Sequence, residues 1–299
     1  MFTPSMWRAF HPQLHQFLTL VALLILGKQV AFVHLPWGAC VGLLLIGLAV
    51  DQLFVYMRYK EHTYIAYSSL STTIGVMLML VATHFWIYAV VVGLALAQKH
   101  LVRVDARHFF NPSNFALMAA MILFYNEAHL VLGQLGESLV LRLCVMVLAA
   151  VILIRVDRWV IPLVFGMTYL WAEYIWIVGY DPVMMFEEIY ERFYSVSFVV
   201  FVAFMLTDPR VTPPGFVQQV VFGAAVALIG VWMDRMSGFR VQHLFMALFV
   251  LSPWVPLFYV DASHRKKTLL VSLVLFLLAV GAIMYIENQP PYYFEMNGV

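Results

Sequence analysis

The sequence predicts an all-α membrane protein, a bundle of about ten or eleven transmembrane helices. Hydrophobic residues make up 64% of the 299 residues and charged residues only 11%, whereas soluble domains have about 45–50% apolar and about 25% charged residues. Apolar runs near the length that crosses a bilayer, about 20 residues, recur along the whole chain. The segments between these runs are too short to form a soluble domain. Residues 1–299 are therefore expected to form a single membrane domain.

Eleven apolar runs are the expected spans. In order, they cover residues 17–33, 39–56, 64–82, 85–101, 115–132, 139–154, 160–178, 194–206, 217–233, 241–259 and 269–286. The run at 115–132 is interrupted by Asn126, Glu127 and His129, and the run at 194–206 is short, so ten spans also remain open. A weak internal repeat in the sequence leaves open that the chain consists of two related halves, 1–155 and 156–299, as in many transporters.

Lysine and arginine residues gather in alternate loops, and such loops usually face the cytoplasm. With a cytoplasmic N-terminus, the inner side would hold most of these residues, among them Arg103, Arg107, Arg158 and Arg210. The net charge of +1 and the lack of a basic stripe give no sign of a nucleic-acid partner.

Polar residues inside apolar runs are costly in a membrane and often functional. Asp51 either pairs with a basic residue or belongs to an ion or proton path. Glu173 lies among aromatic residues, which favours either proton handling or a structural hydrogen bond. Lys28, late in the first run, is expected to reach the interface with its amine. Most of the ten histidines lie at the ends of runs, and the buried cysteines expected at 40 and 144 form no CxxC pair, so neither haem nor a metal site is expected.

A run of hydroxyl residues interrupts the third apolar segment. Ser69, Ser71, Thr72 and Thr73 follow one another within five positions. Small hydroxyl residues allow close packing between helices, and they can also line a ligand site. Both interpretations remain open from the sequence, and we include these four residues in the candidate site.

An Asn-Pro pair marks the start of the next helix after a basic segment. Asn is a good N-cap and Pro is favoured at the first helical position, so Asn111 and Pro112 predict a helix start. Helix N-termini bind anions, and Arg107 and His108 come directly before this one. Arg107, His108, Asn111 and Asn114 are therefore candidate ligand-binding residues. The alternative is a capped helix beside cytoplasmic positive charges.

A second Pro-marked motif ends the eighth run. Thr207 and Asp208 precede Pro209, and two further prolines and a glycine force a turn before the next run. Asp208 is expected to pair locally with Arg210. Both Pro-marked motifs fall on the predicted inner side, so Thr207 and Asp208 could share one pocket with Asn111.

Taken together, these motifs resemble a known family. FFNPSNF at residues 109–115, followed by FMLTDPRVTP at 204–213, is similar to motifs in two membrane proteins of redox-driven ion pumps, NqrB of the sodium-translocating NADH:quinone oxidoreductase and RnfD of the Rnf complex. The similarity is greatest to a divergent RnfD-like branch that includes the enediyne-biosynthesis protein UnbU. Ser69–Gly75 and Lys99–Phe115 resemble motifs of that branch, and the resemblance covers residues 68–215.

The resemblance implies a bacterial inner-membrane subunit that binds flavin and takes part in electron transfer coupled to ion movement. Family members carry FMN esterified to a threonine in a loop after the Asn-Pro helix. The corresponding loop here, residues 126–138, has no threonine, so covalent FMN is not expected. A non-covalent flavin (FMN or riboflavin) or a quinone remains the expected cofactor.

Three functions remain open. The leading one is a membrane subunit of an electron-transfer complex that depends on partner subunits and has no catalytic residue of its own. The second is a scaffold subunit without a cofactor, for which the acidic stretch 187–191 and the tail 290–294 would be docking surfaces. The third is a transporter or channel for a small solute, with Asp51 and Glu173 along its path.

Overall fold

The computed structural model describes residues 12–31, 33–60, 66–104, 107–179, 193 and 195–290. The described residues are 77% helical and form eleven α-helices and two short pairs of strands. The all-α prediction is therefore confirmed. The acidic stretch 187–191 and the tail from residue 291 onward, which the scaffold hypothesis uses, lie outside the described residues.

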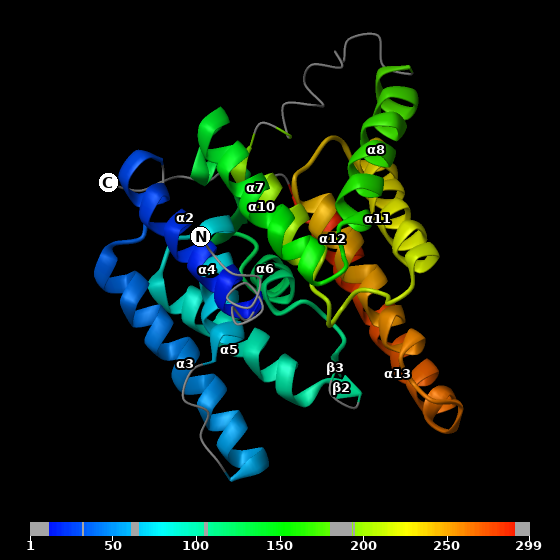
Figure 1. Cartoon of the computed structure of the whole chain (residues 1–299), viewed down its shortest axis with the longest axis horizontal. Coiled ribbons are helices and arrows are strands. Elements are labelled where there is room, and N and C mark those ends of the chain that lie inside the picture. Colours follow the sequence, from blue (N-terminus) through cyan, green and yellow to red (C-terminus); the bar gives the residue numbers. More distant parts are fainter. Residues whose placement is uncertain are drawn as a thin grey trace, which may run out of the picture.

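The first half of the chain forms the helices coloured blue to green in Figure 1. Their bounds are α2 (Pro12–Val30), α3 (Trp37–Tyr59), α4 (Tyr67–Met79), α5 (Phe85–Leu101) and α6 (Pro112–Leu123). Helix α4 is almost wholly buried and packs against α2, α3, α5 and α6. At Gly75 of α4, a Cβ atom would lie 2.9 Å from Ser113 Oγ. The lack of a side chain there lets α4 and α6 approach closely.

The second half covers the other side of the molecule. Its helices are α7 (Leu139–Arg155), α8 (Val160–Glu173), α10 (Val196–Val200), α11 (Phe216–Ser237), α12 (Gln242–Leu251) and α13 (Ala262–Glu287). Helix α11 packs along α8, and at Gly223 a Cβ atom would lie 3.0 Å from the carbonyl oxygen of Ile161. Helix α12 is buried and contacts α6, so it joins the two halves (Figure 1).

The expected span at residues 115–132 is wrong as a single helix. Helix α6 ends at Leu123, and Ala128–Leu130 form strand β4. This strand pairs antiparallel with β1 (Leu80–Ala82), which ends the segment expected at 64–82. Asn126 and Glu127 are exposed in the turn before β4. The strand pair supplies hydrogen bonds to backbone groups that two interrupted helices would otherwise leave unpaired.

Three other segments change their helical pitch before they end. A π-helix, η2 (Tyr174–Val178), continues α8, and another, η4 (Phe201–Met205), continues α10. A 3₁₀ helix, η5 (Ser252–Phe258), continues α12, and it contains Pro253 and Pro256, which cannot donate backbone hydrogen bonds. Such irregular stretches were not expected, because a continuous apolar run does not specify the helical pitch.

In the part of the chain that the structure describes, three helices are long and apolar enough to cross a membrane by length and composition: Trp37–Arg58, Phe216–Ser237 and Ala262–Glu287. Apolar side chains also cover the outside of the bundle, since Leu45, Val217 and Leu278 are each at least 62% exposed. The last of these helices begins seven residues before the expected residue 269. Cys40 is buried as expected, but Cys144 is exposed, so that expectation is wrong for the second cysteine.

Candidate functional site

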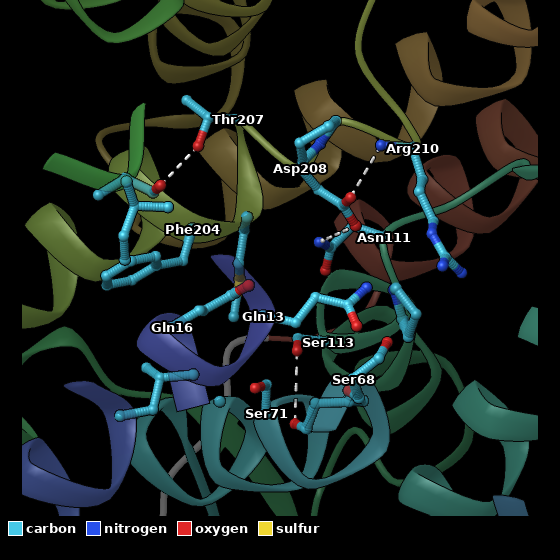
Figure 2. A pocket seen from close by; sticks show the side chains of 18 of the residues that line it. Gln13, Gln16, Ser68, Ser71, Asn111, Ser113, Phe204, Thr207, Asp208 and Arg210 are labelled. Carbon is cyan, nitrogen blue, oxygen red and sulfur yellow. Dashed lines mark hydrogen bonds between the residues drawn. The ribbon is translucent and has the colours of Figure 1, made fainter. Parts of the chain in front are cut away.

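A pocket of about 270 Å³ lies where the N-terminal ends of three helices meet. Helices α2, α4 and α6 point their first turns into it, and η4 and the chain after it close the other side (Figure 2). Each helix N-terminus carries a partial positive charge from its unpaired N–H groups. The polar side chains around the pocket are Gln13, Gln16, Ser68, Ser71, Thr72, His108, Asn111, Ser113, Thr207, Asp208 and Arg210.

The two Pro-marked motifs are joined by hydrogen bonds at the pocket. Asn111 Nδ2 donates to Asp208 Oδ2 at 3.1 Å (Figure 2). The other carboxylate oxygen of Asp208 accepts from the backbone N–H of Arg210 at 2.9 Å, so the expected pairing with Arg210 involves its backbone instead of its guanidinium. Arg107 Nη1 donates to the carbonyl oxygen of Pro209 at 2.9 Å. Residues about 100 positions apart in the sequence therefore form one wall.

Asn111 is the N-cap of α6, as the sequence predicts. Its Oδ1 accepts from the backbone N–H of Asn114 at 3.1 Å, and Pro112 is the first helical residue. The same side chain thus caps the helix with its oxygen and reaches Asp208 with its nitrogen. This double use fixes the start of α6 against the turn after η4.

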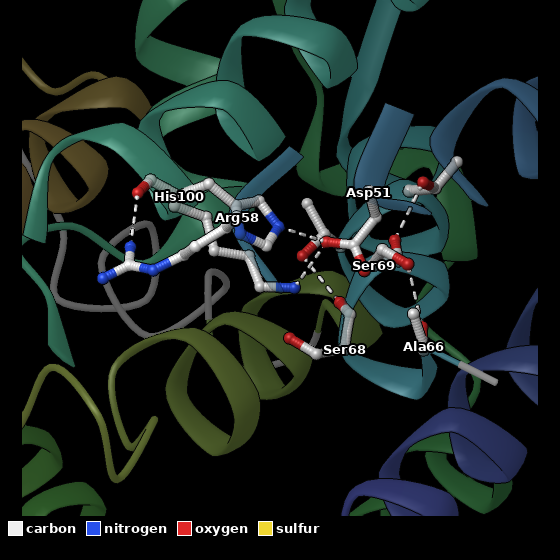
Figure 3. A network of polar contacts seen from close by, with 9 residues as sticks. Asp51, Arg58, Ala66, Ser68, Ser69 and His100 are labelled. Carbon is white, nitrogen blue, oxygen red and sulfur yellow. Dashed lines mark hydrogen bonds and ion pairs between the residues drawn. The ribbon is translucent and has the colours of Figure 1, made fainter. Parts of the chain in front are cut away.

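The hydroxyl run divides between two faces of α4. Ser71 and Thr72 line the pocket. Ser69 donates to the carbonyl oxygen of Ala66, and Thr73 donates to that of Ser69 (Figure 3). Thr73 also lies against Gly47 of α3, where no side chain would fit. The packing interpretation therefore describes Ser69 and Thr73, whereas Ser71 and Thr72 belong to the pocket.

Two buried polar atoms at the pocket have no hydrogen-bond partner among the described residues. They are Ser71 Oγ and His108 Nδ1, on residues that are 7% and 3% exposed. Burial lowers the pKa of His108 to about 4, so its ring is neutral at pH 7. A buried polar group without a partner costs about 1–3 kcal/mol. Such groups in a pocket point to a polar ligand or bound water.

Two other expected residues lie beside the pocket and not in it. Asn114 Nδ2 donates to the carbonyl oxygen of Phe245 at 3.1 Å, which ties α6 to α12. The guanidinium of Arg107 lies over the Tyr259 ring, 3.4 Å from its centroid. The pocket thus collects six of the ten expected ligand-binding residues: Ser71, Thr72, His108, Asn111, Thr207 and Asp208.

Asp51 is paired with basic residues, as one of its two interpretations predicts. Its Oδ1 accepts from Lys99 Nζ at 2.9 Å and lies 2.8 Å from His100 Nε2, all in buried surroundings (Figure 3). Glu173 is fully buried at the end of α8. Helices α3 and α8 lie at opposite sides of the molecule in Figure 1. The two acids expected along one ion path are therefore far apart.

The structure also contains a buried cluster that was not predicted. His243 Nδ1 lies 2.7 Å from Asp234 Oδ1, and His243 Nε2 lies 3.3 Å from Glu287 Oε1. The three residues come from α11, α12 and α13, so their separations in sequence follow no helical spacing. The sequence analysis also did not predict Gln13 and Gln16 at the pocket. Two glutamines three positions apart at the start of an apolar run are nevertheless a visible signal.

In comparisons with known proteins, no family model and no curated protein sequence matches this chain. The resemblance to NqrB and RnfD therefore depends on the short motifs themselves. What the structure adds is their arrangement, since both motifs and half of the hydroxyl run border the same pocket.

Proposed function

We propose that this chain is a multi-pass membrane subunit of an electron-transfer complex, and that its polar pocket binds a flavin or a quinone non-covalently. The observation that carries the proposal is the meeting of the two Pro-marked motifs and the hydroxyl run around buried polar atoms without partners among the described residues. When bound, such a group would supply reversible electron transfer. The pocket would supply hydrogen bonds and a surrounding poor in water.

The residues present suit the ring of such a cofactor. Both groups carry carbonyl oxygens, which the hydroxyl of Ser71 and free N–H groups at helix N-termini can bind. The neutral ring of His108 offers one donor and one acceptor nitrogen. The pocket volume of about 270 Å³ lies just below the common range for ligand sites, about 300–1,000 Å³, which fits a ring better than a whole dinucleotide.

Partner subunits and orientation belong to the same proposal. Short loops leave no room for a domain that would collect electrons from a soluble donor, so a partner would deliver them. With several membrane spans and a cytoplasmic N-terminus, the pocket would lie near the cytoplasmic face of a bacterial inner membrane.

The absorption spectrum of the full-length protein, purified with any subunits that accompany it, tests this proposal. We expect flavin absorption bands, or a quinone in the organic extract, in close to equimolar amount. Asn111→Ala and Asp208→Ala should remove most of the bound group because they separate the two motifs. Asn288→Ala, which changes an exposed asparagine at the far end of α13, should retain it. Folded wild-type protein that yields neither group would refute the proposal.

One observation favours a second function, transport of a small solute. Helices α4 and α6 both begin at the pocket and both give way to the paired strands β1 and β4. Transporters commonly place their substrate sites at the ends of interrupted helices. Solute flux in proteoliposomes that Ser71→Ala abolishes, in protein free of flavin and quinone, would support transport over electron transfer.

A further inference from the structure

Helix α13 carries its charged side chains only near its two ends. Arg265, Lys266 and Lys267, which we call the basic trio, lie close to its start, and Glu287 is its last residue. Between them, residues 268–286 contain no Asp, Glu, Lys or Arg, and this stretch is roughly 28 Å long at about 1.5 Å per residue. The hydrocarbon core of a bilayer is about 30 Å thick. When α13 crosses a membrane, the basic trio therefore lies at the level of the lipid headgroups.

The basic trio is exposed, and its side chains make no hydrogen bond or ion pair within the part of the chain that the structure describes. Other basic residues on the same predicted side of the membrane are used by the fold. Lys99 Nζ pairs with Asp51 at 2.9 Å, and Arg158 Nε donates to Thr212 Oγ1 at 2.8 Å. Three adjacent positive charges on α13 thus remain available to a partner outside the chain.

The stability of α13 does not explain the basic trio. A helix N-terminus carries a partial positive charge, so cations close to it are unfavourable. Asp261 comes just before the helix, but its side chain makes no cap hydrogen bond, and with the trio it leaves a net charge of +2. Residues 261–267 are all exposed, and this end of α13 projects from the bundle (Figure 1). An anion bound from outside would offset the repulsion.

An exposed apolar surface follows the basic trio directly. Leu270, Leu277 and Leu278 are 63%, 59% and 65% exposed. Residues seven or eight positions apart lie on the same face of a helix, so these leucines form one stripe along α13. A surface with cations at headgroup level and an apolar stripe below them matches the two parts of a phospholipid.

From this arrangement we infer that the start of α13 binds an anionic phospholipid of the cytoplasmic leaflet. The phosphate of the headgroup contacts the basic trio, and an acyl chain lies along the leucine stripe. Each basic residue near an anionic membrane surface contributes a preference of roughly fivefold. The inference goes beyond the proposed function, since it depends on the membrane location of the chain and not on a cofactor.

Two other anionic partners fit the same surface less well. A free phosphate would use the cations and leave the leucine stripe without a role. An acidic protein would need the charges but not their distance from Glu287, which matches the thickness of a bilayer. Both are distinguished by the experiment.

The experiment counts lipids bound to the purified full-length protein in detergent by native mass spectrometry. Phosphatidylglycerol is the anionic probe, phosphatidylcholine is the lipid without net charge, and glycerol 1-phosphate is a competitor that has the headgroup phosphate without acyl chains. We expect the wild type to bind phosphatidylglycerol at least tenfold more tightly than phosphatidylcholine. An excess of glycerol 1-phosphate equal to the lipid concentration should not displace the lipid.

The test variant replaces the basic trio with glutamine (R265Q/K266Q/K267Q). It should lower the preference for phosphatidylglycerol to less than twofold and leave binding of phosphatidylcholine unchanged. The variant R265K/K266R/K267R keeps all three charges and should match the wild type. Lys60→Gln is a second control, since Lys60 is exposed at the end of α3 and its amine lies over the Tyr56 ring, 5.5 Å from the centroid.

Thermal unfolding without added lipid checks that the trio does not serve the fold. The glutamine variant should be at least as stable as the wild type, because it removes cations from a helix N-terminus. Added phosphatidylglycerol should raise the unfolding temperature of the wild type more than that of the variant. A variant that is clearly less stable without lipid would show that the trio stabilises the fold itself, and would overturn the inference.

Equal binding of the two lipids by the wild type, or an undiminished preference in the glutamine variant, would also overturn the inference. Displacement by glycerol 1-phosphate would assign the trio to a free anion. Loss of a co-purifying acidic protein from the glutamine variant, with the lipid preference intact, would assign it to a protein partner. None of these results depends on a flavin or quinone, so this inference and the proposed function can fail separately.

Discussion

The polar pocket and the His243 cluster are both buried and polar, yet they differ in how their atoms are paired. At His243, both ring nitrogens face carboxylates, Asp234 at 2.7 Å and Glu287 at 3.3 Å. Asp234 also accepts from the backbone N–H of Arg240 at 2.9 Å. At the pocket, Ser71 Oγ and His108 Nδ1 have no partner among the described residues. Paired polar groups stabilise the fold, whereas unpaired ones leave binding capacity for a ligand.

The largest expected effect concerns the paired cluster. His243→Ala should lower the free energy of unfolding by about 3–5 kcal/mol, because it removes the partner that both carboxylates share and leaves that of Asp234 buried beside an empty space. Thermal unfolding in detergent measures the change. His264→Ala is the control, since that histidine is exposed at the start of α13. A loss below about 1 kcal/mol would mean that the cluster does not hold α11, α12 and α13 together, and the comparison would fail.

An intermediate effect concerns pH and separates the two regions further. Burial lowers the pKa of His108 to about 4, from an ordinary value of about 6.5. Between these values the unfolded chain binds a proton that the folded chain does not. Stability should therefore be fully present above about pH 6.5 and fall as the pH drops, by roughly 1.4 kcal/mol per pH unit.

His108→Gln should remove this part of the pH dependence. The measurement is the midpoint of chemical unfolding at several pH values between 7 and about 4.5, compared between the variant and the wild type. Identical slopes for both proteins would show that His108 is not held neutral in the folded state.

The sequence predicted the regular parts of this fold well and the irregular parts poorly. The expected run at 85–101 coincides with α5. An uninterrupted apolar segment between polar ends predicts one continuous helix. The run at 115–132 failed, because apolarity alone does not distinguish a continuous helix from a helix that turns into the β1–β4 pair. The change to π or 3₁₀ pitch in three segments is equally invisible to a pattern of apolar residues.

The candidate residues show a similar contrast between local signals, which the sequence reveals, and long-range packing, which it does not. Asn111 and Asp208 could be found because cap and turn chemistry is local, and prolines mark both positions. Their hydrogen bond across 97 positions depends on packing between α4, α6 and η4. The separation of Ser71 from Ser69 also needs the helix neighbours, since both faces of α4 are buried. His243, Asp234 and Glu287 meet only through three helix contacts, so no motif shows them.

The smallest expected effect tests the pocket side of the comparison directly, through Ser71→Ala. Because the hydroxyl has no partner among the described residues, its removal should leave the ligand-free protein unchanged or stabilise it by up to about 1 kcal/mol. The same change should weaken ligand binding about five- to tenfold, which corresponds to roughly 1–1.4 kcal/mol for one lost hydrogen bond.

Ser197→Ala is the matched control, because Ser197 Oγ is also buried without a partner among the described residues but does not line the pocket. Both variants should behave alike in thermal unfolding and differ only in binding. A clear loss of stability in Ser71→Ala would place this hydroxyl with the paired groups of the fold and remove the main sign of a ligand at the pocket.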